Sequence, residues 1–184
     1  MGRIPDLVPE RLTSDGRALY DSIAGGPRAA GPQHFALTNP DGSLRGPFNA
    51  MLLAPGLGAA LQDLGAAIRY RGTLTDRARE IAILLVAARW DSAFEREAHE
   101  AVGRATGLAD DELAALRRED AAAFAGVEGA VARATVALLD GDLDDAAWAD
   151  AEEALGAAGV LELSTLVGYY ATLALQLRVF RVGV

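Results

Sequence analysis

Cysteine is the residue that this sequence lacks altogether, and its absence removes several kinds of chemistry. The chain has 184 residues and no cysteine. Disulfide bonds, thiolate nucleophiles, iron–sulfur clusters and cysteine zinc sites are therefore excluded. Only two histidines are present, so imidazole chemistry is restricted to His34 and His99.

Positive charge and long apolar segments are also scarce. Lysine and arginine total 17 against 26 acidic residues, which gives a net charge of −9. This balance argues against binding to nucleic acid or to an anionic membrane. No apolar run reaches 18 residues, so we expect no membrane-spanning helix, and residues 1–10 do not resemble a signal peptide. We therefore expect a cytoplasmic protein with neither of these partners.

Aromatic residues and strand-forming runs are few, whereas helix formers are abundant. Aromatic residues make up 6% of the chain, and hydrophobic residues, with alanine prominent, make up 51%. Alanine, leucine, glutamate and arginine dominate the middle and the end of the chain, and all four favour helices. The sequence therefore predicts an all-α fold in one domain covering residues 1–184.

Helix-breaking residues concentrate in the first fifty positions. Glycine, proline, asparagine and aspartate cluster at 25–27, 31–32 and 39–42, and such clusters mark turns. We expect residues 1–47 to form a mostly irregular wrap. One short helix is predicted within it, from Ser14, as the N-cap, to Ile23.

From Pro47 onward the pattern is helical. Thr75 is the expected N-cap of a helix whose interior, residues 81–88, is apolar on every side. Such a helix lies at the centre of a domain or inside an oligomer. The predicted helices cover approximately residues 48–53, 55–70, 76–90, 92–106, a short segment after 110, 118–139, 144–156 and 160–179.

His99 lies in a polar stripe at helical spacing. At the angular step of an α-helix, Ser92, Glu95, His99 and Gly103 share one side, next to an apolar face, and Gly103 leaves space over that stripe. Glu95 and His99 are four residues apart and can interact directly. A carboxylate beside an imidazole suits proton transfer, although such a pair is also common on solvated helix faces.

Glu80 is the most informative carboxylate because it shares a face with apolar residues of the most apolar helix. A buried carboxylate there must be hydrogen-bonded, paired or neutral. The alternative is an ion pair with Arg77 or Arg79 at the rim of the domain. We predict Glu80, Glu95 and His99 as the catalytic set, while a metal site on the same three residues remains an alternative.

Substrate-binding residues are predicted by their chemistry. A guanidinium forms two hydrogen bonds to a carboxylate, and Arg45 or Arg89 is the candidate for this role. Ser92 and Asn49 are further candidates, although Asn49 also suits a cap of the short helix. Tyr169, Tyr170 and Trp90 are expected in the core or an interface, and His34 suits either a loop contact or a lid.

These residues carry a resemblance to a known family. The segment 75–83, followed by Glu95, His99 and Gly103 at four-residue steps and by Gly107-Leu108, resembles the carboxymuconolactone decarboxylase family, which includes the AhpD-like alkylhydroperoxidases. Residues 39–49 resemble one subgroup. The resemblance covers residues 40–113 and implies an all-α, AhpD-like helical bundle that assembles into trimers or hexamers.

The resemblance also implies roles for single residues. The glutamate and histidine of the peroxidase relay correspond to Glu80 and His99, whereas its two cysteines correspond to Ser92 and Glu95. Serine and glutamate cannot cycle through a disulfide, so thiol peroxidase activity is excluded. The decarboxylase branch lacks the cysteine pair and commonly carries a carboxylate where Glu95 stands.

We therefore expect a cofactor-free, metal-free lyase that acts by proton transfer on a small carboxylate- or carbonyl-bearing substrate. His99 is the expected general acid and base, Glu95 orients it, and Glu80 shuttles or holds the proton. One alternative is a non-catalytic oligomeric binding protein derived from an AhpD-like peroxidase. Another is an isomerase or hydrolase on the same scaffold. The sequence leaves the substrate open.

Overall fold

The computed structural model describes residues 2–26, 29–30 and 34–182, and it confirms the all-α prediction. Within these residues there is no strand, only an isolated bridge between Thr38 and Leu44. The elements are η1 (Pro9–Arg11), α1 (Ser14–Ala24), α2 (Pro47–Met51), α3 (Pro55–Tyr70), α4 (Asp76–Arg89), α5 (Ala93–Ala105), α6 (Asp110–Arg117), η3 (Ala121–Ala123), α7 (Gly126–Asp140) and α8 (Asp145–Phe180).

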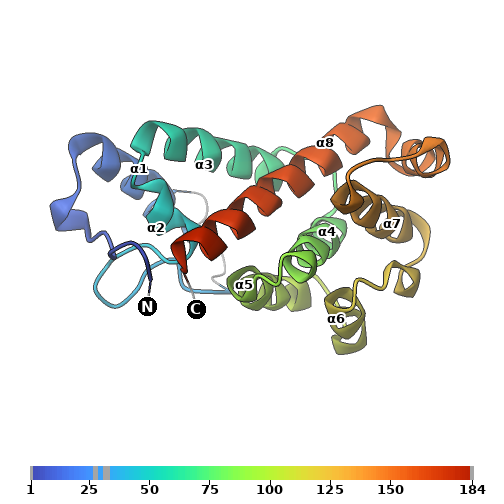
Figure 1. Cartoon of the computed structure of the whole chain (residues 1–184), viewed down its shortest axis with the longest axis horizontal. Helices are drawn as coiled ribbons and strands as arrows, with labels where there is room; N and C mark the ends of the chain where they lie inside the picture. Colours follow the sequence, from blue (N-terminus) through green and yellow to red (C-terminus); the bar gives the residue numbers. More distant parts are fainter. Residues whose placement is uncertain (1, 27–28, 31–33, 183–184) are drawn as a thin grey trace.

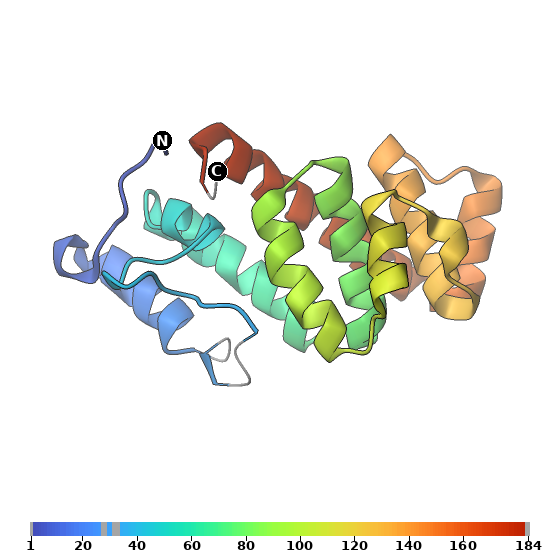
Figure 2. The same ribbon diagram turned by 90° about the horizontal axis from the view of Figure 1, so that it is seen from below.

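Helix α4 forms the centre of the protein, as its apolar surface predicts. Every residue from Ala78 to Ala87 is buried, and α4 packs against α5, α6, α7 and α8 (Figure 2). Thr75 caps the helix as expected, because its hydroxyl accepts a hydrogen bond from the Ala78 N–H. A helix that is buried on all sides holds the side chains on it in fixed positions.

Helix α8 is the longest element and runs from the α7 side of the molecule toward the N-terminal segment (Figure 1). Gly156 interrupts it with non-helical backbone angles, φ 68° and ψ 164°, so the predicted break near this residue is correct. By length and hydropathy alone, α8 could cross a membrane, contrary to the expectation that no segment would. Half of its apolar window is buried inside the protein, and a core helix meets the same criteria.

The N-terminal segment wraps around the end of the molecule where the C-terminal end of α8 also lies (Figure 1). The Arg3 N–H donates to the Phe180 carbonyl at 2.8 Å. The buried Asn49 side chain accepts from the Leu7 N–H at 2.9 Å and donates to the Pro5 carbonyl at 3.0 Å. Asn49 therefore holds the N-terminal segment in place, and Gly46, not Asn49, is the N-cap of α2.

Two predicted helix starts are wrong for identifiable reasons. Helix α1 is capped by Thr13, whose hydroxyl accepts from the Gly16 N–H, and Ser14 is its first residue. The helix predicted over 118–139 begins only at Gly126. Glu119 has a left-handed φ of 55°, and the Asp120 carboxylate accepts from the Ala122 N–H. These local features favour the short η3 turn over an α-helix.

Candidate active site

The centre of the candidate site is a buried contact between His99 on α5 and Glu80 on α4. His99 Nδ1 lies 2.6 Å from Glu80 Oε2. Glu80 is completely buried, and His99 is 5% exposed. Glu80 does not pair with Arg77 or Arg79, because Arg77 binds Glu112 and Glu128, and Arg79 binds Asp76. The interpretation of Glu80 as a rim residue is therefore wrong.

Glu95 lies on the other side of the imidazole ring. Its Oε2 atom is 3.5 Å from His99 Nε2, and its side chain is also buried. The three residues predicted as the catalytic set are thus brought together around one ring. Each imidazole nitrogen faces a different carboxylate, Nδ1 at hydrogen-bond distance and Nε2 at a longer one.

A small cavity lies beside His99. It has a volume of about 30 Å³ and is lined by His99 and Glu95 but not by Glu80. This volume admits about one or two water molecules. Glu95, the carboxylate nearer to Nε2, therefore lines the cavity together with His99, whereas Glu80 does not.

Aromatic rings and one arginine form the rest of the cavity wall. The Tyr170 ring meets His99 edge to face, with centroids 5.2 Å apart, and it packs in the same way on Tyr169. Both tyrosines belong to the core, as expected. Arg69 lines the cavity as well, and its Nη1 lies 4.0 Å from Glu80 Oε1. This oxygen accepts no hydrogen bond from the described residues.

The sharp connection between α4 and α5 sets the register of the site. Trp90 is the C-cap residue of α4, and Ser92 is the N-cap residue of α5. Asp91, between them, adopts a left-handed φ of 46°. The expected space over Gly103 is filled, because a Cβ on this glycine would lie 2.8 Å from a Leu108 methyl group. Gly103 therefore allows α5 and the following turn to pack closely.

Two of the predicted substrate-binding residues lie elsewhere. Arg89 makes ion pairs of 2.7 Å with Glu119 and with Asp140, and it does not line the His99 cavity. These hydrogen bonds, that of Glu119 first, raise the pKa of Arg89. Asn49 binds the N-terminal segment, as described above. Neither side chain reaches His99.

The other two predicted binding residues line separate pockets near the site. Arg45 reaches the Ala36 carbonyl at 3.5 Å, and its Cζ lies 6.0 Å from the Phe94 ring centroid. Ser92 is buried in the pocket between the α4–α5 connection and α8. His34 is exposed and does not line the cavity, although the next residue, Phe35, does.

Arg69 is the functional candidate that the sequence analysis missed. It lies at the end of α3, which contacts α8, far in sequence from the Glu95–His99 motif. Arg69 lies near Glu80 because of how the helices pack, and the spacing of residues along the sequence does not predict that packing. Ile68, next to it, is buried, which shows only that this end of α3 reaches the core.

The alternative of a metal site receives no support from the geometry of the described residues. Within residues 2–26, 29–30 and 34–182, no group of three or more histidine, aspartate or glutamate side chains is arranged to hold a metal ion. Comparison of the chain with known protein families and with curated proteins finds no match. The similarity to the carboxymuconolactone decarboxylase family accordingly stays a prediction from the sequence.

Proposed function

We propose that this protein is a cofactor-free acid–base enzyme, similar to carboxymuconolactone decarboxylases, that acts on a small carboxylate- or carbonyl-bearing substrate. The observation that carries the proposal is the buried contact of 2.6 Å between His99 Nδ1 and Glu80 Oε2. A hydrogen bond of this kind fixes the orientation and tautomer of an imidazole. It leaves Nε2 as the nitrogen that faces the cavity.

The proton transfer follows from this arrangement. Glu80 accepts the Nδ1–H hydrogen bond and positions the ring, while Nε2 exchanges the proton with the substrate. In a decarboxylation, the electrons of the breaking C–C bond form an enolate as CO₂ leaves. The Nε2–H then donates its proton to carbon, and water returns a proton to Nε2. Glu95, 3.5 Å from Nε2, interacts with the protonated ring.

Arg69 is the residue that best suits a substrate carboxylate in this cavity. Its side chain is 21% exposed and lines the cavity together with His99. A guanidinium binds a carboxylate through two parallel hydrogen bonds. Arg69 therefore takes the role for which the sequence favoured Arg45 or Arg89.

Substrate binding must enlarge the cavity, because about 30 Å³ holds no more than water. Phe35 and Phe94 line it and are only partly buried. Neither ring belongs to the innermost core around α4. We infer that movement of these two rings admits the substrate, while Glu80 and His99 keep their positions.

The test is proton exchange by His99 on a panel of small 2-keto and 3-keto acids. In D₂O, ¹H NMR follows the loss of the protons next to the carbonyl and any release of CO₂. His99→Gln keeps an amide that can donate to Glu80 and should lower the rate by about 10²–10⁴-fold. Arg89→Gln changes a remote ion pair and is the matched control. Equal rates in His99→Gln and the wild type would refute the proposal.

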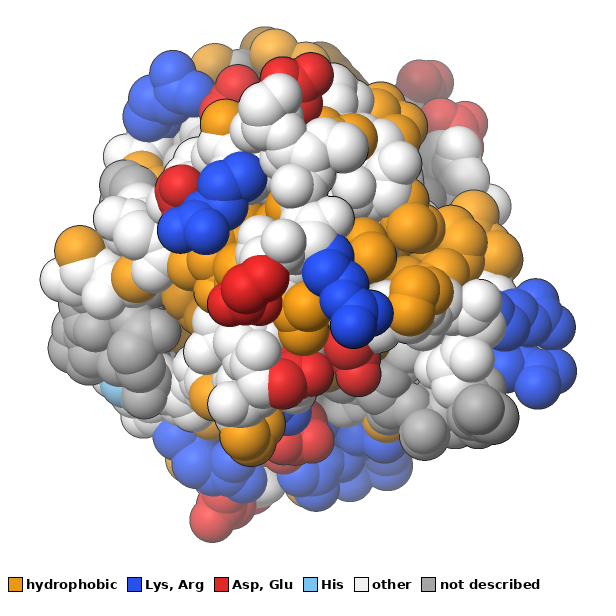
Figure 3. Space-filling model, turned by 90° about the vertical axis from the view of Figure 1, so that its left-hand side faces the viewer, with side chains coloured by type: hydrophobic (Ala, Val, Ile, Leu, Met, Phe, Trp, Pro, Cys, Tyr) orange, Lys and Arg blue, Asp and Glu red, His pale blue; other side chains and the backbone are white. Residues whose placement is uncertain are grey.

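A non-catalytic binding protein is the second candidate, because the cavity beside His99, at about 30 Å³, has no room for a substrate. Assembly into a homo-oligomer is compatible with both candidates. Large apolar side chains are exposed on α3 and α8, among them Leu57 at 64% and Leu161 at 68%. Hydrophobic side chains also reach the surface at the end of the molecule that contains the N-terminal wrap (Figure 3). Light scattering during size-exclusion chromatography distinguishes a monomer from an oligomer.

A further inference from the structure

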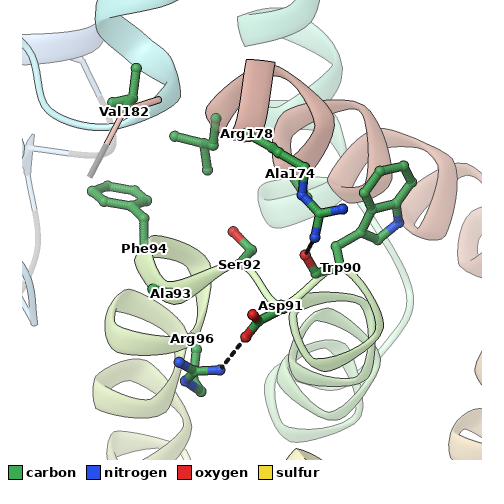
Figure 4. Close-up of a pocket in the computed structure, with 10 residues that line it drawn as sticks. Trp90, Asp91, Ser92, Ala93, Phe94, Arg96, Ala174, Arg178 and Val182 are labelled. Carbon is green, nitrogen blue, oxygen red and sulfur yellow. Dashed lines mark hydrogen bonds and ion pairs between the residues drawn. The ribbon is translucent and has the colours of Figure 1, made fainter. Parts of the chain in front are cut away.

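A second and much larger pocket lies between the α4–α5 connection and the C-terminal part of α8 (Figure 4). Its volume is about 390 Å³, within the range of small-molecule sites. Apolar side chains from both sides form most of its wall, including Phe94 and Leu177. Phe94 also lines the His99 cavity, so the two spaces share this residue.

Ser92 places a polar group without a partner in this wall. The residue is 8% exposed, and its hydroxyl forms no hydrogen bond with any described residue. Figure 4 shows the hydroxyl directed at the space between Phe94 and α8. Burial of an unpaired hydroxyl is unfavourable, and rotation of the Ser92 side chain toward the pocket would let a ligand atom satisfy it.

The N-terminus of α5 points at the same space. Ser92 is the N-cap residue of this 13-residue helix, yet its side chain caps none of the first N–H groups. These N–H groups carry the positive end of the helix dipole and bind anions. The usual intramolecular acceptor is therefore turned away from the helix end.

Arg178 adds a positive charge on the opposite wall. Its guanidinium donates to the Trp90 carbonyl and stacks on the Trp90 ring, with Cζ 5.7 Å from the centroid. It makes no ion pair with any carboxylate in the described part of the chain. The other arginine of the pocket, Arg96, is already paired with Asp91 at 3.5 Å.

We propose that this pocket binds an organic monocarboxylate. The carboxylate lies between the α5 N-terminus, the Ser92 hydroxyl and the Arg178 guanidinium, and the apolar body of the ligand packs against Phe94 and Leu177. Because Arg96 is paired with Asp91, Arg178 supplies one net positive charge, which matches a single negative charge better than a doubly charged phosphate. The site is separate from His99 and does not depend on the proposed catalytic function.

Calorimetric titration of the full chain with benzoate and hexanoate tests this proposal. Benzyl alcohol and hexanol serve as neutral analogues, and inorganic phosphate serves as the dianion. We expect saturable binding of the carboxylates and at least about tenfold weaker binding of the alcohols and of phosphate. Equal affinity for alcohol and carboxylate would show an apolar pocket without an anion site and would overturn the proposal.

Variants locate the binding site. Ser92→Ala removes an unpaired hydroxyl, so its melting temperature without ligand should equal or exceed that of the wild type, while its affinity falls about fivefold. Arg178→Gln should lower affinity by about tenfold or more, whereas Arg17→Gln, at an exposed ion pair on α1, should leave it unchanged. Wild-type affinity in both Ser92→Ala and Arg178→Gln would contradict the assignment.

His99→Gln separates this proposal from the proposed enzymatic function. The variant should bind benzoate as the wild type does, because His99 does not line the large pocket. Loss of binding in His99→Gln would place the ligand in the small cavity instead and overturn the second site. Loss of proton exchange with retained binding would leave both proposals standing.

Discussion

Arg77 and Glu80 lie one turn apart on helix α4, and their surroundings differ. Arg77 donates to Glu128 at 2.8 Å, to the Gly107 carbonyl at 2.5 Å, and to Glu112. Glu80 is more deeply buried. It has His99 at 2.6 Å on one oxygen and no hydrogen bond from a described residue on the other.

The difference separates a structural cluster from a candidate active site. The Arg77 cluster joins α4 to α6 and α7 through carboxylates that leave little capacity for a ligand. The Glu80–His99 pair lies at a cavity and keeps an unsatisfied oxygen. Buried polar groups in native proteins nearly always form hydrogen bonds. A buried Glu80 oxygen without one, next to a titratable histidine, therefore indicates function more strongly than burial or charge alone.

The largest expected effect is the loss of stability when one member of the buried pair is removed. His99→Leu leaves the carboxylate of Glu80 buried without its partner, which typically costs about 3–5 kcal/mol. The double variant Glu80→Leu/His99→Leu should recover part of that loss, because the Glu80 carboxylate is gone while Glu95 stays buried. Urea denaturation at pH 8 measures both free energies of unfolding.

Either of two results would contradict the difference drawn between the Arg77 cluster and the Glu80–His99 pair. If His99→Leu and the double variant were equally unstable, lost packing and not an unpaired charge would explain the effect. If His99→Leu were as stable as the wild type, the contact with Glu80 would contribute nothing to folding. Either result would weaken the case for an oriented imidazole.

The second prediction concerns the Arg77 cluster and is smaller. Arg77→Met removes the donor to two carboxylates whose side chains are 24% and 30% exposed. Water can partly hydrate both, so we expect a loss of about 1–3 kcal/mol, below that of His99→Leu. Proton exchange by His99 should remain as in the wild type. A loss of exchange in Arg77→Met at full helicity would show that the two regions are coupled.

Local patterns in the sequence were sufficient to predict most helices and the Glu95–His99 spacing, whereas the association of Glu80 with His99 came from the family resemblance. Thr75 marks the start of α4 correctly, and the apolar surface of residues 81–88 places Glu80 in the interior. The i,i+4 spacing places Glu95 beside His99. These predictions depend only on helix periodicity and burial, which are properties of one segment at a time.

The remaining features depend on contacts between segments far apart in the chain. The sequence made Arg89 a candidate for substrate binding. In the structure it is paired instead with Glu119 and Asp140, which lie 30 and 51 residues farther along the chain. Arg69 reaches Glu80 only because of the packing of α3. The late start of α7 follows from the left-handed Glu119. A single sequence carries no signal for such distant pairings.

The smallest predicted effect is the pH dependence that Glu112 gives to the structural cluster. The Ala109 N–H, and then Arg77, donate hydrogen bonds to its carboxylate and lower its pKa from the ordinary value of 4.5. A lowered pKa in the folded state stabilises the protein above 4.5, and this contribution is lost as the pH falls toward the folded value. Glu112→Gln should therefore be less stable than the wild type at pH 7.

The same variant should lose less stability on acidification. Between pH 7 and pH 3, the free energies of unfolding of wild type and Glu112→Gln should converge. Protonation of Glu112 removes the carboxylate charge from the wild type, and the variant has already lost that charge. Because Glu112 is 24% exposed, the difference at pH 7 should stay near or below about 1 kcal/mol. Parallel pH profiles would show that the cluster owes its stability to packing and not to charge.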